Sequence, residues 1–182
     1  MKNLKSIFDN CGFSYIFYEG VSLRNRLYIC DLIKQNLNDQ FEQEWRDHCQ
    51  NSSKGKSYRL FTNDIFEIQN YITSEICNNE IRTLARFRCT NHKLPIEIGR
   101  WINLDREERM CNLCESDIGD EFHYVMQCPF LNFERSLYLP EYLVSYPNIF
   151  KFHLLFSTKD TDVLKKLCLF IKKVNQRVTP PG

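Results

Sequence analysis

Three cysteines and one histidine lie within eighteen residues near the middle of the chain, as Cys111, Cys114, His123 and Cys128. Their spacing is Cys-x2-Cys-x8-His-x4-Cys, similar to that of a zinc knuckle. Three thiolates and one imidazole can close a tetrahedron around Zn²⁺, with sulfur at about 2.3 Å and nitrogen at about 2.0 Å. Four protein ligands leave no position for a catalytic water, so the expected zinc ion is structural. The alternative is a set of buried free thiols, because free cysteine is among the most buried residue types.

The local sequence predicts how the first two ligands are held. Cys-x2-Cys places two thiolates on one tight turn, and the segment 117–120, which contains Gly119, is typical of a chain reversal. The four ligands can therefore come from one compact loop.

The last two ligands belong to a predicted short helix over residues 121–127, with Asp120 as its N-cap. On an ideal α-helix, positions five apart differ by about 140°, so His123 and Cys128 cannot point the same way. Pro129 disfavours the helical conformation at Cys128, and we expect this to turn the Cys128 sulfur back toward the metal.

The sequence around the ligands resembles the zinc-binding region that follows the polymerase domain of LINE-like non-LTR retrotransposon reverse transcriptases. The resemblance rests on three stretches: LARFRCTNHKLPIEIGRW (84–101), DREERMCNLC and GDEFHYVMQCPF. It covers roughly residues 84–135, and residues 39–61 resemble the preceding part of such proteins more weakly. The resemblance implies a small zinc module associated with nucleic-acid binding, with the same four ligands. Asp105 stands where the family usually has a proline.

The polymerase itself is not expected in this chain. A reverse transcriptase needs clustered aspartates that hold two metal ions, and no Asp-Asp pair occurs among the 182 residues. Asp105, Glu107 and Glu108 are the densest carboxylates near the basic segment, and we expect them to form a solvated turn or helix start. The chain is therefore interpreted as a detached fragment and not as an enzyme.

Composition predicts one hydrophobic core, with or without a small satellite module, because 43% of the residues are apolar and 14% aromatic. Nine cysteines, an odd number, and the lack of an apolar segment after the first residues argue against a secreted disulfide scaffold. We expect an intracellular protein, nuclear or cytoplasmic, with no membrane partner. Cys89 and His92 lack further ligands at a suitable spacing, so no second metal site is predicted.

The predicted fold is mainly α, a helical domain with a small structural zinc module. We expect a helical N-terminal region (1–81), the zinc-binding module (82–135) and a helical C-terminal region (136–182). Helices are predicted over 21–50 (one helix, or two joined near 36–39), 73–89, 129–139, 140–146 and 161–176, with a short extended piece at 58–61. Thr73 to Glu75 and Thr161 are the expected helix starts.

Three of these helices have an apolar stripe, which is interpreted as core packing. The stripe of the first is Leu23, Leu27, Cys30, Ile33, Leu37, Phe41 and Trp45. That of the second is Cys77, Ile81, Leu84 and Ala85, and that of the last is Val163, Leu164, Leu167, Phe170, Ile171 and Val174.

Charge is distributed unevenly along the chain, although the net charge is only +1. Residues 82–109 carry net +3, residues 110–150 net −5 and residues 151–182 net +5. Zinc with three thiolates makes the middle block more negative, so we expect RNA or DNA to contact the segment before it. The candidate phosphate contacts are Arg86, Arg88, Lys93, Arg100, Arg106 and Arg109, with Trp101 available for base stacking.

Two alternatives remain open from the sequence. The arginines could instead pair with Glu97, Glu107 and Glu108, with Trp101 in the core. The chain as a whole could be a zinc-stabilised helical protein-interaction module, whose acidic loop 115–121 faces a protein partner.

Overall fold

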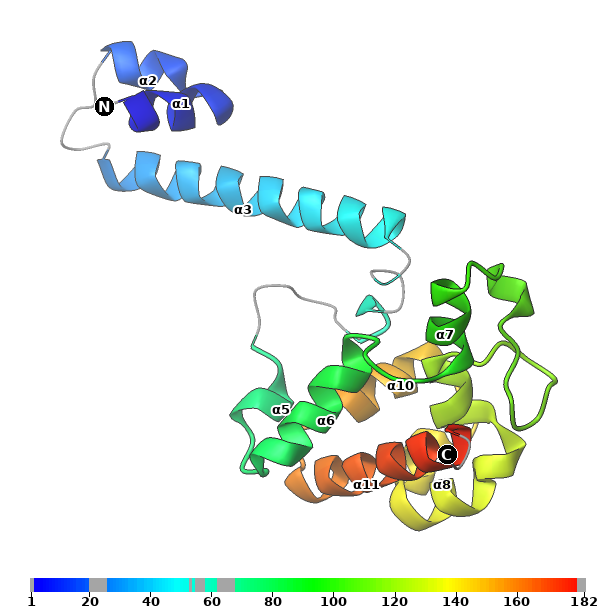
Figure 1. Ribbon diagram of the computed structural model, residues 1–182. Coiled ribbons are helices and arrows are strands. Elements are labelled where there is room, and N and C mark those ends of the chain that lie inside the picture. Colours follow the sequence, from blue (N-terminus) through cyan, green and yellow to red (C-terminus); the bar gives the residue numbers. More distant parts are fainter. Residues whose placement is uncertain (1, 20–25, 53, 55–57, 62–67, 180–182) are drawn as a thin grey trace. The chain divides into compact units, whose positions relative to one another are not determined.

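The computed structural model describes residues 2–19, 26–52, 54, 58–61 and 68–179 of the chain. The fold is mainly α-helical, as predicted, and within these ranges the only β pairing is an isolated antiparallel bridge between Met110 and Ile118 (Figure 1). The chain divides into two compact units, residues 1–51 and 52–182. None of the described helices has the length and apolar character needed to span a membrane.

The first unit contains α1 (Lys2–Asn10), α2 (Ser14–Glu19) and α3 (Arg26–Asn51). The turn between α1 and α2 is built around Gly12, whose φ of 74° lies in the left-handed region that favours glycine. The Phe13 N–H donates to the Phe8 carbonyl at 2.8 Å, and the Gly12 N–H to the Asp9 carbonyl at 3.2 Å. This pair of hydrogen bonds is a Schellman motif, which closes the end of α1.

Helix α3 confirms the long helix predicted in this region, and it continues through residues 36–39 without a break. Residues 21–25 of the prediction lie outside the described residues. The expectation that its apolar stripe packs in a core is wrong for four members, which are exposed: Leu27 (81%), Cys30, Leu37 (44%) and Phe41 (53%). Cys49 is the buried residue of this helix.

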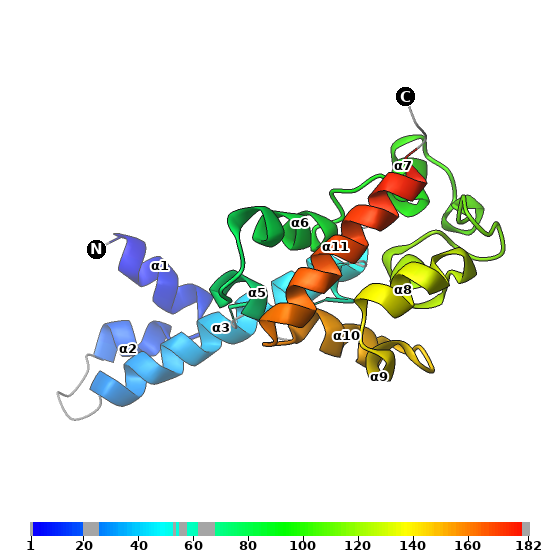
Figure 2. The ribbon, with the colours of Figure 1, turned by 90° about the horizontal axis from the view of Figure 1, so that it is seen from below.

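The second unit is organised around α11 (Thr161–Val178), which packs against α6 (Asn78–Arg88) and α8 (Asn132–Tyr138) (Figures 1 and 2). The predicted apolar stripe of this helix is confirmed, because all of its members are buried: Val163, Leu164, Leu167, Phe170, Ile171 and Val174. The N-cap is Asp160 and not Thr161. Its carboxylate accepts hydrogen bonds from the Asp162 and Val163 N–H groups at 2.9 and 3.2 Å.

Helix α6 begins later than predicted, after a separate short helix α5 (Asn70–Thr73). Its N-cap is Cys77, and Glu80 accepts a hydrogen bond from the Cys77 N–H at 2.8 Å, which completes a capping box. Cys77 is therefore exposed, whereas it was expected to face inward; Leu84 of the same stripe is buried. The extended piece predicted at 58–61 is also wrong, because the Phe61 N–H donates to the Tyr58 carbonyl in a turn.

The remaining elements surround this scaffold: α7 (Pro95–Trp101), η2 (Arg106–Glu108), η3 (His123–Gln127), η4 (Pro129–Leu131), α9 (Glu141–Val144) and α10 (Ile149–Ser157). Elements η4, α8 and α9 agree with the helices predicted after Pro129 and Pro140, whereas α7 and α10 were not predicted. Helix α10 contributes Phe152 and Phe156, whose rings lie 5.0 and 4.8 Å from that of Phe61. This aromatic cluster forms the end of the core next to α6.

Candidate metal centre

The four predicted ligands converge in the second unit, where one ligand atom each of Cys111, Cys114, His123 and Cys128 lies within 4.8 Å of the others. The Cys111 and Cys128 sulfurs are 3.8 Å apart, and the Cys114 sulfur is 3.3 Å from His123 Nε2. A tetrahedral zinc with the usual bond lengths requires about 3.8 Å between sulfurs and about 3.6 Å between sulfur and nitrogen. The residues therefore fit a metal ion of this kind, and the structure shows a cluster that could hold one.

The first two ligands lie on the predicted chain reversal. The Cys111 N–H donates to the Asp117 carbonyl at 2.8 Å, and the Glu115 N–H donates to the Cys111 carbonyl at 2.9 Å. The strand-like bridge between Met110 and Ile118 closes the base of this loop. The loop is thus held by its own backbone, and both thiols project from one turn.

Gly119 is required by close packing at the end of this loop. A Cβ atom there would lie 2.9 Å from Pro95 Cγ and 3.0 Å from Cys111 Cα. The Gly119 N–H also donates to the Arg109 carbonyl at 2.8 Å, and its carbonyl accepts from the Ile96 N–H at 3.2 Å. The loop is therefore fixed on both sides against the start of α7.

His123 and Cys128 are brought together by a π-helical turn. The predicted N-cap is confirmed, since Asp120 Oδ1 accepts from the His123 N–H at 2.9 Å. The Cys128 N–H then donates to the His123 carbonyl at 2.8 Å, an i→i+5 bond in place of the α-helical i→i+4 bond. One turn therefore holds an additional residue, and positions five apart return to the same side. Cys128 leaves the helical region, with ψ of 118°, as predicted from Pro129.

The surroundings of the cluster favour the metal-binding protonation state of two side chains, His123 and Cys114. Burial lowers the pKa of His123, which favours the neutral imidazole that coordinates metals. Burial by itself raises the pKa of the Cys114 thiol. Hydrogen bonds from Ser116 act in the opposite direction and hold this pKa below its usual value. Ser116 Oγ lies 3.1 Å from the Cys114 sulfur. Burial raises the pKa of Cys128 to about 12. A buried thiolate at Cys128 therefore needs a positive charge beside it, which a metal ion supplies.

The far side of the His123 ring faces a carboxylate. Nε2 points to the Cys114 sulfur, whereas Nδ1 lies 3.6 Å from Asp117 Oδ2. Metal-bound histidines commonly direct their second ring nitrogen at a carboxylate, which fixes the ring orientation. The fractional exposures of the two side chains are 4% and 55%, so Asp117 approaches the buried ring from the solvent side.

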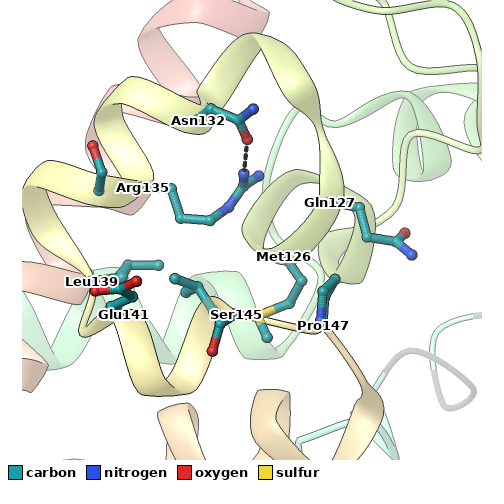
Figure 3. A pocket seen from close by; sticks show the side chains of 10 residues that line it. Met126, Gln127, Asn132, Arg135, Leu139, Glu141, Ser145 and Pro147 are labelled. Carbon is teal, nitrogen blue, oxygen red and sulfur yellow. Dashed lines mark hydrogen bonds between the residues drawn. The ribbon is translucent and has the colours of Figure 1, made fainter.

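Arg135 fastens the π turn to α8 and was not identified from the sequence. The residue is 6% exposed, and its guanidinium donates to the carbonyls of Val125 and Cys128 at 2.8 and 3.0 Å, and to Asn132 Oδ1 at 2.6 Å. Figure 3 shows Arg135 and Asn132 beside a cavity of about 580 Å³ that Met126 also lines. Because its donors are occupied by the protein, Arg135 acts here as a positioning residue for the turn that carries Cys128.

A second tie joins the cysteine turn to the end of α11. Asn112 receives a hydrogen bond from the Tyr124 hydroxyl, and its side-chain amide donates to the Val178 carbonyl at 3.0 Å. Burial raises the pKa of Tyr124, so its hydroxyl stays protonated as the donor. The turn that carries Cys111 and Cys114, the π turn and α11 are therefore linked through Asn112.

Two of the predicted nucleic-acid contacts donate to backbone carbonyls within the protein, and burial makes the prediction wrong for Arg88. Arg88 is 1% exposed and donates to the carbonyls of Phe61 and Phe156 at 2.6 and 3.2 Å. Arg109 donates to the carbonyls of Ile96 and Leu104, each at 3.1 Å. Both guanidiniums stabilise loops of the second unit. Arg88 belongs to no open phosphate-binding surface, whereas Arg109 is half-buried and its contact with a nucleic acid stays a prediction.

Trp101 remains on the surface, with 71% of its area exposed, so the alternative that places it in the core is wrong. Its Nε1 donates to Glu97 at 2.9 Å, and Glu97 also accepts from Arg100 at 3.0 Å and lies 3.5 Å from Lys54 Nζ. Burial raises the pKa of Glu97, but the hydrogen bonds from Arg100 and Trp101 and the charge of Lys54 outweigh it and lower the pKa. The cations of Arg100 and Lys54 lie 5.0 and 5.9 Å from the Trp101 ring centroid.

The other predicted basic contacts are exposed. Arg106 pairs with Asp120 at 2.9 Å, whereas Arg86 and Lys93 are exposed at and after the end of α6. Glu107 and Glu108 lie on the solvated 3-10 turn, as expected, and Glu108 accepts from the Asp105 N–H at 3.2 Å.

The acidic loop of the protein-interaction alternative is only partly available. Glu121 is fully buried and bonded to His92 Nε2 at 2.9 Å, and Asp120 is engaged by Arg106. Glu115 and Asp117 are its exposed carboxylates.

Comparisons with models of known families, with curated proteins and with solved structures give no match. Cys111, Cys114, His123 and Cys128 form a Cys₃His cluster that could hold a metal ion, with Cys114 half-buried and the other three buried.

Proposed function

We propose that the Cys₃His cluster holds one structural Zn²⁺ and that the second unit is a zinc-stabilised module that binds single-stranded RNA or DNA. The zinc assignment is carried by the four ligand atoms within 4.8 Å of one another. The ion cross-links the cysteine turn to the π turn, and such sites contribute apparent binding free energies on the order of 10–16 kcal/mol. The resemblance described above supports an origin in a non-LTR retrotransposon reverse transcriptase without its polymerase domain.

The nucleic-acid part of the proposal rests on the group formed by Trp101, Arg100 and Lys54. An exposed indole offers a surface for base stacking, and neighbouring cations attract the phosphate backbone. Glu97 is the carboxylate bound within this group, so two cations face one anion and the group stays positive. The bonds from Arg100 and Trp101 to Glu97 hold these side chains in place before a strand arrives.

Zinc content tests the first part. Elemental analysis of the purified chain should find one zinc ion per molecule, and His123→Ala should weaken or release it. Cys89→Ser is the matched control, because Cys89 is an exposed free thiol outside the cluster. Protein without stoichiometric zinc, or equal zinc retention by the His123 variant, contradicts the assignment.

Strand binding tests the second part. Fluorescence anisotropy with a short labelled single-stranded RNA, and with the DNA of the same sequence, should show binding that weakens steeply with salt. Trp101→Ala should weaken it by about five- to a hundredfold, because stacking is worth about 1–3 kcal/mol per base. Phe133→Ala is the control, since Phe133 is 74% exposed on α8. No binding of either strand at low salt contradicts this function.

The second candidate is a zinc-stabilised protein-interaction module. It is favoured by aromatic side chains on and around α8 to α10 that are 67–89% exposed, namely Phe133, Tyr142, Tyr146 and Phe150. The same anisotropy titrations separate the two functions, because a protein-interaction module binds neither strand.

A further inference from the structure

A basic cavity of about 310 Å³ lies between α6 and α11, the two helices that pack side by side in Figure 2. Its cationic lining comes from three separate segments: Arg86 from α6, Lys93 from the loop after α6, and Lys172 from α11. Arg86 and Lys93 are among the phosphate contacts predicted from the sequence, whereas Lys172 is not among them and is 79 positions beyond Lys93 in the chain. Only the packing of α11 against α6 brings it to the same cavity.

The cavity has positive charge that nothing in the described part of the protein neutralises. Arg86, Lys93 and Lys172 are exposed, and none of them forms an ion pair with a described carboxylate. No acidic side chain lines the cavity among the described residues. The carboxylate of Glu121 reaches His92 from the other side but is fully buried. Three like charges at one concave site repel one another, and an anion placed among them relieves that repulsion.

The rest of the lining suits an oxyanion. Asn91, Asn175 and Thr179 supply amide and hydroxyl groups, and the side chain of His92 is 1% exposed and held by Glu121. Phe87, which is 1% exposed, adds an apolar side chain to the lining. A few polar groups beside apolar side chains are typical of small-ligand sites, which have volumes of about 300–1,000 Å³.

We propose that this cavity binds a phosphate group, held by Arg86, Lys93 and Lys172. The source of that phosphate rests on the proposed function: it is the backbone of the single strand that the second unit binds. A free phosphate compound shares the same chemistry, and the experiment distinguishes the two sources.

The test uses the full chain carrying Arg86→Gln, Lys93→Gln and Lys172→Gln. At about 50 mM salt its affinity for single-stranded RNA should fall on the order of tenfold. The plot of log affinity against log salt should also flatten by about 0.7 for each phosphate that the variant no longer neutralises. Equal zinc content and an unchanged melting temperature show that the variant is folded.

The matched control carries Arg82→Gln, Lys165→Gln and Lys173→Gln. These residues lie on the same two helices and are exposed, but they do not line the cavity. The control removes the same charge with the same residue types. If only the general loss of positive charge matters, the affinity for RNA falls equally in both triple variants. If the cavity is a phosphate site, the affinity falls further in the cavity variant than in the control.

A second measurement uses inorganic phosphate against chloride at constant ionic strength, followed by the NMR shifts of the Asn91 and Asn175 amides. Saturable shifts in the parent that vanish in the cavity variant support the site. If the parent binds RNA and both triple variants bind it equally, saturable shifts assign the cavity to a free phosphate compound. If the variants bind RNA equally and phosphate causes no shifts, the phosphate site is overturned and the strand-binding function stands. If the parent binds no RNA, the proposed function fails, and the phosphate titration alone supports or overturns the cavity.

Discussion

Gly119 lies where the metal-binding loop passes closest to its surroundings, so Gly119→Ala tests how tightly this loop is packed. The added methyl group would lie 2.9 Å from Pro95 Cγ and 3.0 Å from Cys111 Cα. Neither neighbour can withdraw easily, because one belongs to a closed ring and the other to backbone held at 2.8 Å by the Asp117 carbonyl. The φ angle of Gly119 is outside the left-handed region, so the expected effect is steric alone.

The size of the effect follows from two opposing contributions. Overpacking costs about 1–3 kcal/mol, and the reduced flexibility of the unfolded chain offsets about 0.4–1 kcal/mol of it. A net loss of about 1–2 kcal/mol lowers the melting temperature of a domain of this size by about 4–8 °C. If the strain falls on the metal-bound loop, zinc affinity falls by about five- to thirtyfold.

The assay is thermal unfolding by circular dichroism with zinc bound, together with competition against a chelator. Gly12→Ala serves as the control for zinc affinity, because Gly12 lies in the first unit, outside the metal-binding loop. The φ of 74° strains an alanine there, so this variant should lower the melting temperature and leave zinc affinity unchanged. A Gly119 variant that melts at or above the parent temperature, with parental zinc affinity, would refute this account of the loop.

Three further substitutions test the surroundings of the cluster. Glu115→Gly should raise stability by about 0.5–1 kcal/mol in thermal melts, because Glu115 has φ of 55°, a region that disfavours side chains; a lower melting temperature would contradict this. Asp117→Asn should lower zinc affinity by about 10–100-fold in chelator competition, since it removes the charge facing His123 Nδ1, and unchanged affinity would exclude that role. Arg135→Met should lower the free energy of unfolding in urea by about 3 kcal/mol or more, because it leaves the buried Cys128 carbonyl without its donor. A loss below about 1 kcal/mol would show that the π turn is stable without Arg135.

The parts that the sequence predicts well depend on neighbouring residues along the chain. The four ligands, the Asp120 cap and the apolar stripe of α11 each follow from spacing within one segment. Arg88 could not be placed in this way, because its burial depends on the Phe61 and Phe156 carbonyls, which tertiary packing brings to it. For the same reason a count of charges could not separate internal arginines from exposed ones.

Two local errors have different causes. Helix α10 was missed because Ile149–Ser157 is apolar on nearly all sides, which hides the helical period. The start of α6 was misplaced because Thr73 and Ser74 are common N-cap residues, whereas Cys77 takes that role here with Glu80. Both predictions relied on patterns that most helices follow, an amphipathic period and a Ser or Thr N-cap, and these two helices have less common ones.

The π turn at His123–Gln127 has a consequence for how insertions and deletions act on this region. A π turn is equivalent to an α-helical turn that has gained one residue. Deleting one residue between His123 and Cys128 would leave the two ligands four positions apart, and an ordinary α-helical turn places such positions within about 40° of each other on one face. The π turn is therefore what a gap of four residues requires at this site. A related chain with a gap of three would bring the same two side chains together on an ordinary α-helical turn.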